Sequence, residues 1–224
     1  MGAIAEAFRT GGIWMYIILA VSIITIGITI ERFIYLFFKY SVNAEPFMAQ
    51  IQKLVMANNI DRAIKLCNAQ PSAALPRVIK AGLTRANKGE VEIQNALEEA
   101  TLEVVPMVQK RTPILQPLAN IATLLGLLGT IVGLIEAFEA LEKATPETRQ
   151  KLLARGIALA MNTTAFGLIV AIPTLIFHMI LSSMTKKILD EIDMHSVKLE
   201  NLLISRGKSG GAVAHLFDLK ADRS

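Results

Sequence analysis

The sequence has few charged residues and only one cysteine. Asp, Glu, Lys and Arg make up 19% of its 224 residues, whereas 53% are hydrophobic; an ordinary soluble domain has about 25% charged residues. A single cysteine, Cys67, excludes an internal disulfide framework. GxSxG, P-loop, HExxH and paired-cysteine motifs are absent from the sequence, so we expect no enzyme, no metal site and no cofactor. Its basic residues are interleaved with acidic ones, which argues against nucleic-acid binding.

The hydrophobic residues are concentrated in three runs without Asp, Glu, Lys or Arg, at residues 10–30, 112–135 and 156–185. About 20 apolar residues cross the hydrocarbon core of a bilayer as a helix. The runs therefore predict an all-α integral membrane protein with three transmembrane helices, extended by cytoplasmic helices. The first run is too long for a cleaved signal peptide, and apolar residues resume after Glu31–Arg32.

The distribution of positive charge predicts the topology. Segments 31–113 and 186–224 together carry eighteen Lys and Arg residues, and the rest of the chain carries five. The positive-inside rule then places the N-terminus in the periplasm and the C-terminus in the cytoplasm of a bacterial inner membrane. The expected segments are transmembrane helix 1 (10–38), a cytoplasmic helical insertion (39–111), transmembrane helix 2 (112–138), a periplasmic loop (139–155), transmembrane helix 3 (156–185), a cytoplasmic helical extension (186–206) and a flexible tail (207–224).

Small and hydroxyl-bearing residues follow the second span. Gly126, Gly129 and Gly133 recur at three- and four-residue steps, which permits close approach of another helix in lipid. Thr123 and Thr130 are seven residues apart and share a face. We expect these hydroxyls to line a polar path; the alternative is that each threonine only bonds the backbone of its own helix.

The third span carries a polar cluster at Asn162, Thr163 and Thr164. Polar groups at this depth face the helix bundle or a cavity rather than lipid. Gly167 extends the small face of this span, and Pro173 is expected to bend the helix. Asn162 has two interpretations, a functional polar group or a hydrogen bond that holds helices together.

Two stretches resemble a known family. Leu124-Leu-Gly-Leu-Leu-Gly-Thr-Ile-Val-Gly-Leu-Ile-Glu-Ala-Phe138 and Gly156-Ile-Ala-Leu-Ala-Met-Asn-Thr-Thr-Ala-Phe-Gly-Leu-Ile-Val-Ala-Ile-Pro173 are similar to the signatures of the MotA/TolQ/ExbB proton-channel family, closest to its TolQ and ExbB branch. The resemblance implies a homopentamer around a single-span partner of the TolR/ExbD/MotB type, whose membrane Asp takes up and releases protons. It also implies that Thr130 and Thr164 line the pore. The function implied is a stator subunit that converts proton motive force into mechanical work on the cell envelope: transport energisation, envelope maintenance or gliding motility.

Two positions depart from the family pattern. Leu159 stands where TolQ and ExbB proteins often carry Glu, and Thr123 stands where the family usually has Pro. Among side chains that titrate near neutral pH, only His178 lies within the three charge-free runs, near the cytoplasmic end of the third, so a partner must supply the group that carries protons. A non-energised scaffold that organises envelope proteins is the alternative function.

Glu136 and Glu139 follow the second span. A helix rises 1.5 Å per residue, so these carboxylates are expected at the outer interface. There they have two possible roles, to attract cations to a channel mouth or to stand as ordinary solvated carboxylates.

Overall fold

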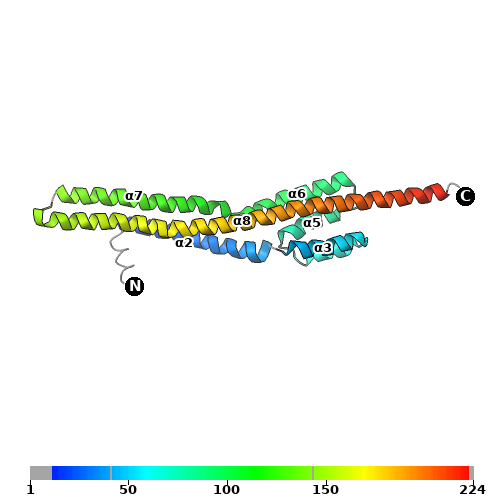
Figure 1. Ribbon diagram of the computed structural model, residues 1–224, viewed down its shortest axis with the longest axis horizontal. Coiled ribbons are helices and arrows are strands. Elements are labelled where there is room, and N and C mark those ends of the chain that lie inside the picture. The colour runs from blue at the N-terminus through cyan, green and yellow to red at the C-terminus, as the bar shows by residue number, and fades with distance from the viewer. Residues whose placement is uncertain (1–11, 41, 143, 222–224) are drawn as a thin grey trace. The chain divides into compact units, whose positions relative to one another are not determined.

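The computed structural model describes residues 12–40, 42–142 and 144–221, with side chains described up to residue 206. Within these ranges every regular element is helical (Figure 1). In chain order the elements are α2 (Gly12–Ile34), the π-helical segment η1 (Tyr35–Tyr40), α3 (Ala44–Met56), α4 (Ile60–Asn68), α5 (Ala74–Thr84), α6 (Glu90–Gln109), the 3₁₀ segment η2 (Thr112–Ile114), α7 (Leu115–Glu142) and α8 (Pro146–Ala221).

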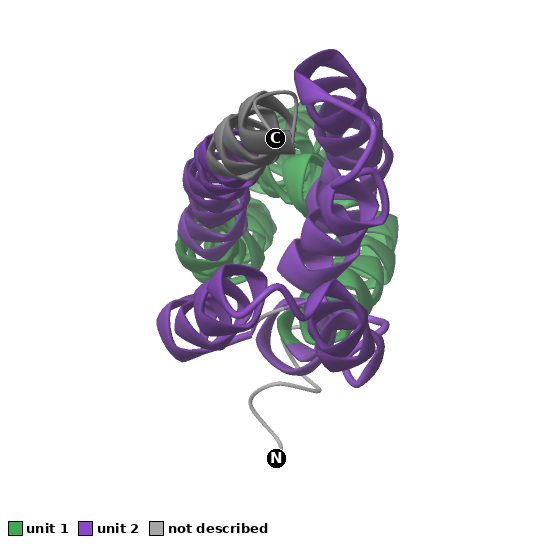
Figure 2. Cartoon of the chain, turned by 90° about the vertical axis from the view of Figure 1, so that its right-hand side faces the viewer, with its two compact units in different colours: residues 1–33, 111–182 green, residues 34–110, 183–224 purple. Residues whose placement is uncertain are grey.

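The helices fall into two compact units (Figure 2). Unit 1 comprises residues 1–33 and 111–182, and unit 2 comprises residues 34–110 and 183–224. Three helical segments are long and apolar enough to cross a membrane, within Gly12–Met56, Glu90–Glu142 and Pro146–Arg206. The all-helical class and the three apolar helices expected from the sequence are therefore confirmed.

The segment between the second and third spans differs from the loop that the sequence predicts at 139–155. Helix α7 continues to Glu142 and α8 begins at Pro146. Proline suits the first position of a helix because the amide hydrogen it lacks would be unpaired there. Glu147 lies in the first turn, where a carboxylate is favoured by the helix dipole. The carbonyl of Thr145 accepts the first backbone bonds, from Thr148 and Arg149.

Helix α8 runs without interruption from the third span to Ala221. It includes Pro173, the expected extension at 186–206 and residues 207–221, for which the sequence predicts a flexible tail. Each glycine weakens a helix by about 1 kcal/mol. Elongation adds a hydrogen bond per residue once a helix is nucleated, so three glycines near its end do not force it to stop.

The core of unit 1 is built from α2, α7 and α8. Ile18 of α2 packs with Ala119 and Ala122 of α7 and with Val170 and Ala171 of α8. Alanine at the contact allows helix backbones to come close together, which is the main source of helix association in lipid.

The core of unit 2 brings α5, α6 and the second half of α8 together. A Cβ atom on Gly82 would lie 2.7 Å from Leu97 Cδ2 and 3.3 Å from Leu199 Cδ2, so these leucine side chains fill the space beside the glycine where the three helices meet. Cys67 is buried in this unit, and burial raises the pKa of its thiol to about 11. The thiol is therefore protonated at neutral pH and a poor nucleophile.

His195 lies on the buried face of α8 in unit 2, with 4% of its surface exposed and neither ring nitrogen hydrogen-bonded. Desolvation, together with the charge of Lys198, lowers the pKa of the imidazole below 6.5, against the opposing charge of Glu45 in α3. The unfolded chain therefore binds a proton near pH 6.5 that the folded chain does not, and stability falls as the pH drops below that value.

We expect His195→Leu to raise the free energy of unfolding by about 1 kcal/mol or more, because it removes two unpaired polar atoms. We also expect it to flatten the loss of thermal stability between pH 7.5 and pH 5, measured by circular dichroism in detergent. Ser196→Ala is the matched control, since Ser196 is a neighbouring residue with an unpaired hydroxyl that does not titrate. An unchanged pH slope in His195→Leu contradicts the prediction.

Candidate functional site

Helices α7 and α8 pack through a seam of small residues, which we call the α7–α8 seam (Figure 1). A Cβ on Gly126 would lie 3.2–3.3 Å from the α8 backbone at Thr163, Thr164 and Gly167, and one on Gly129 would lie 2.8 Å from Thr163 Cβ. On the opposite side, a Cβ on Gly167 would lie 2.7 Å from the carbonyl oxygen of Ala122. At these glycines the two helices lie too close together for a side chain to fit without a shift.

The seam continues toward the far end of α7. A Cβ on Gly133 would be 3.4 Å from Leu159 and 3.5 Å from Ala160, so Leu159 packs beside Gly133. A Cβ on Gly156 would come within 2.1 Å of Ala137 Cβ. Glycine therefore permits close approach of the two helices at four or more successive positions along the seam.

The seam sets the levels of the hydroxyl residues. Gly129 opposes Thr163 and Gly133 opposes Ala160. Residue numbers therefore rise along α7 in the direction in which they fall along α8. This is the register of two antiparallel helices. Thr130 is one residue after Gly129 and Asn162 is one residue before Thr163, so in antiparallel helices these two lie at the same level. Thr164 lies about 3 Å from Asn162 along α8. Thr123 lies seven residues before Thr130, about 10 Å along α7.

All four threonine hydroxyls donate to backbone carbonyls. Three bond their own helix: Thr123 Oγ1 to Ala119 O at 3.2 Å, Thr130 Oγ1 to Leu127 O at 2.6 Å, and Thr163 Oγ1 to Ala160 O at 2.8 Å. Thr164 differs, because its hydroxyl crosses the seam to the carbonyl of Gly126, at 3.2 Å. A hydroxyl that donates its only proton keeps lone pairs that accept hydrogen bonds.

Burial separates these residues. Thr163 is 1% exposed and packs against Gly129, whereas Thr130, Thr164 and Asn162 are half-buried and Thr123 is exposed. Thr163 therefore has a packing contact in this chain, and a role for its hydroxyl in a polar path stays a prediction. The other four present part of their surface outside the α7–α8 seam.

The remaining predicted residues lie away from the centre of the seam. Pro173 is exposed within α8, and a bend there stays a prediction. Glu136 and Glu139 are exposed in the last two turns of α7. Their role at a channel mouth also stays a prediction.

A polar cluster lies at the start of α7, and its members come from distant parts of the sequence. Glu31 and Arg32 lie in the last turn of helix α2. Arg111 pairs with Glu31, and Arg32 Nε donates to Thr112 Oγ1 at 3.3 Å. Arg32 is 1% exposed. Arg111 has a φ of 61°, in the left-handed region that is uncommon for residues other than glycine. The ion pair stabilises this turn at the entry to the second span.

Comparison with known proteins decides the family. The model of the MotA/TolQ/ExbB proton channel family matches residues 70–194, more than half of the chain. The chain belongs to this family. It is therefore a multi-pass inner-membrane protein of the ExbB/TolQ/MotA type, a class of proton-channel energisers rather than a known class of enzymes.

Two sequence relatives agree with this assignment. A putative ExbB-like biopolymer transport protein of Synechocystis sp. is 30% identical over 75% of this chain and 79% of the relative. The biopolymer transport protein ExbB of Aquifex aeolicus is 35% identical over 46% of this chain and 69% of the relative. The solved structure of C. jejuni MotAB superposes with a TM-score of 0.47 at 14% identity, covering 90% of this chain and 89% of that one.

Proposed function

We propose that this chain is the housing subunit of a proton-driven stator in the inner membrane. Five copies surround a single-span partner of the TolR/ExbD/MotB type, and the partner contributes the membrane Asp. The output is mechanical work on the cell envelope, in transport energisation, envelope maintenance or gliding. The supporting observation is that Thr130 and Thr164 lie within about 3 Å of each other along the axis beside the α7–α8 seam, in runs that contain no Asp, Glu, Lys or Arg.

The hydrogen bonds of these threonines support a specific role. Both hydroxyl protons are donated to carbonyls, so the hydroxyl oxygens can only accept hydrogen bonds from water or from a partner side chain. An acceptor stabilises water, or the protonated form of a partner carboxyl, and repels a bare carboxylate. Thr130 and Thr164 therefore favour the proton-loaded Asp at hydrocarbon depth, and the charged Asp must form where water reaches it.

The proposed orientation has the N-terminus in the periplasm and the C-terminus in the cytoplasm, as the eighteen-to-five distribution of Lys and Arg favours. Protons then move inward, down the gradient. Each proton that crosses 100 mV releases about 2.3 kcal/mol, which is the free energy available for movement of the partner against its housing.

A non-energised scaffold is the second candidate. It is favoured by Leu159, which places an apolar side chain against Gly133 where related proteins often have a carboxylate. A scaffold organises envelope proteins through the same helices and uses no proton gradient.

An uncoupler distinguishes the two functions. If the chain is a stator subunit, we expect its envelope output to stop when the proton gradient is collapsed, and also when the Asp of the partner is replaced by Asn. The output is measured in cells as the envelope phenotype that deletion of this chain produces. Protein level and membrane assembly serve as controls, since both should remain unchanged. Output that persists without the gradient supports the scaffold.

A further inference from the structure

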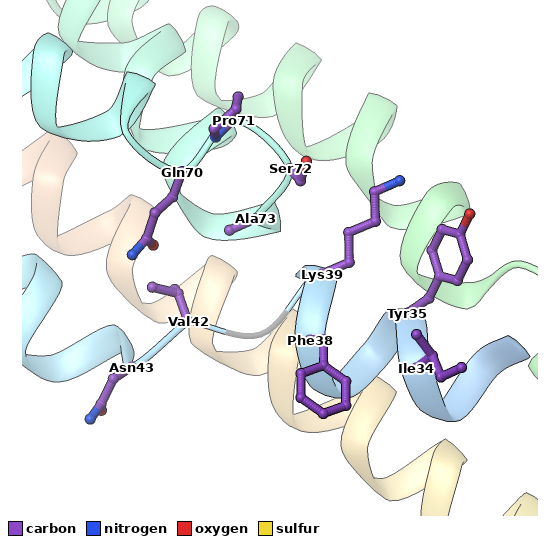
Figure 3. A pocket seen from close by; sticks show the side chains of 10 residues that line it. All are labelled: Ile34, Tyr35, Phe38, Lys39, Val42, Asn43, Gln70, Pro71, Ser72 and Ala73. Atoms are coloured by element: carbon purple, nitrogen blue, oxygen red, sulfur yellow. The ribbon is translucent and has the colours of Figure 1, made fainter. Parts of the chain in front are cut away.

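Unit 2 contains a cavity of about 810 Å³ that the proton path does not use (Figure 3). One wall is formed by Ile34 at the end of α2, by η1 and by Val42 and Asn43 before α3, and the other by the link between α4 and α5 (residues 70–73). This volume is typical of sites that bind small molecules, which occupy about 300–1,000 Å³.

The cavity lies at the boundary between apolar and polar sequence. Ile34 ends the long apolar helix α2, and η1 follows with the sequence Tyr-Leu-Phe-Phe-Lys-Tyr. Aromatic and basic residues at the end of a span mark the interface between hydrocarbon and water. The cavity therefore opens where lipid headgroups meet the protein.

The lining has two kinds of surface. Ile34 and Phe38, which is 74% exposed, provide an apolar part that continues the surface of the span. Lys39, Gln70 and Ser72 provide a polar part with a cation, an amide and a hydroxyl. The ligand that matches both parts is amphipathic.

The charge of the lining is positive. None of the lining residues is acidic, and the Lys39 ammonium lies 4.6 Å from the centroid of the Tyr35 ring. The contact with the ring positions the ammonium at the cavity without neutralising it. An anionic group on the ligand is therefore favoured over a neutral or cationic one.

We infer that this cavity binds one anionic phospholipid from the leaflet that borders unit 2. The phosphate is held by the ammonium of Lys39, with the amide of Gln70 and the hydroxyl of Ser72 as further donors. The upper part of an acyl chain lies along Ile34 and Phe38. The bound lipid ties the end of the first span to the α4–α5 link, independently of the proton path.

The test uses the full chain purified in a zwitterionic detergent, with lipid retention measured by native mass spectrometry. We expect phosphatidylglycerol to be retained at one molecule per chain and phosphatidylcholine to be lost. Lys39→Gln should weaken phosphatidylglycerol binding about tenfold or more, since a hydrogen bond to a charged group is lost. Ser72→Trp should abolish it by filling the cavity.

Lys53→Gln is the matched control, because Lys53 is an exposed lysine of α3 outside the lining, and it should retain the lipid. Three results overturn the inference. The first is equal retention of the two lipids, or retention unaffected by both lining variants. The second is full competition by glycerol 3-phosphate, which identifies a site for soluble phosphate esters. The third is a change of oligomeric mass in Ser72→Trp with lipid retention unchanged, which identifies a second copy of the chain as the occupant.

Discussion

Gly167→Ala is expected to destabilise the α7–α8 seam by about 1–3 kcal/mol, the usual cost of overpacking. The new methyl group would lie 2.7 Å from the carbonyl oxygen of Ala122 and 3.1 Å from Gly126 Cα. Both are backbone atoms, so the clash is relieved only when one helix moves. The intrinsic preference of helices for alanine over glycine, about 1 kcal/mol, opposes this effect without removing it. The measurement is the thermal midpoint of unfolding in detergent, together with envelope output in cells.

The chain offers a matched control for this substitution. Gly27 lies in α2, also within an apolar span, and a Cβ there meets no atom within 4 Å. Gly27→Ala should therefore leave stability unchanged or raise it slightly. Equal effects of Gly27→Ala and Gly167→Ala would show that helix propensity, and not the close approach of α7 and α8, governs the result.

The double substitution Thr130→Val and Thr164→Val is expected to abolish envelope output while the protein still folds. Valine keeps the shape of threonine and removes the oxygen that accepts a hydrogen bond. The structural cost is small: Thr130 bonds only its own helix, and the bond from Thr164 to Gly126 O is worth about 0.6 kcal/mol by comparison with other membrane helices. Output is measured in cells, and folding by thermal midpoint and oligomeric mass.

A second pair of threonines provides the control. Thr25 Oγ1 and Thr29 Oγ1 in α2 donate to the carbonyls of Val21 and Thr25, at 2.7 and 2.8 Å. Thr25→Val with Thr29→Val removes two intrahelical hydroxyl bonds from a span outside the proposed path, and output should persist. Full output in the Thr130 and Thr164 double variant rejects these residues as the acceptors of the proton path.

The glycine and threonine pattern was predictable because a helix has a fixed period. Steps of three and four residues place Gly126, Gly129 and Gly133 on one face, and close van der Waals packing at such a face stabilises helix association in lipid. The same reasoning could not separate Thr163 from Thr164. They are neighbours in sequence, and the rotation of α8 against α7 decides which is buried and which reaches across to Gly126.

Segment ends were less predictable. A loop at 139–155 was expected because charged and polar residues follow the second span. Charged residues are compatible with helix outside the hydrocarbon, so α7 extends to Glu142 and α8 begins at Pro146. The pairing of Glu31 with Arg111 was also out of reach, because the partners are 80 residues apart and meet only when α2 packs beside the start of α7.

The sequence by itself predicted three helices long and apolar enough to cross a membrane, because about 20 apolar residues in a helix match the thickness of the hydrocarbon core. It also showed that the three apolar runs contain no Asp, Glu, Lys or Arg, which is the basis for proposing that a partner supplies the proton carrier. Tertiary structure alone decided which small residues oppose one another, which threonine bridges two helices, and where a cavity opens beside Lys39. These features depend on the relative rotation and register of helices, and contacts between segments distant in sequence set both.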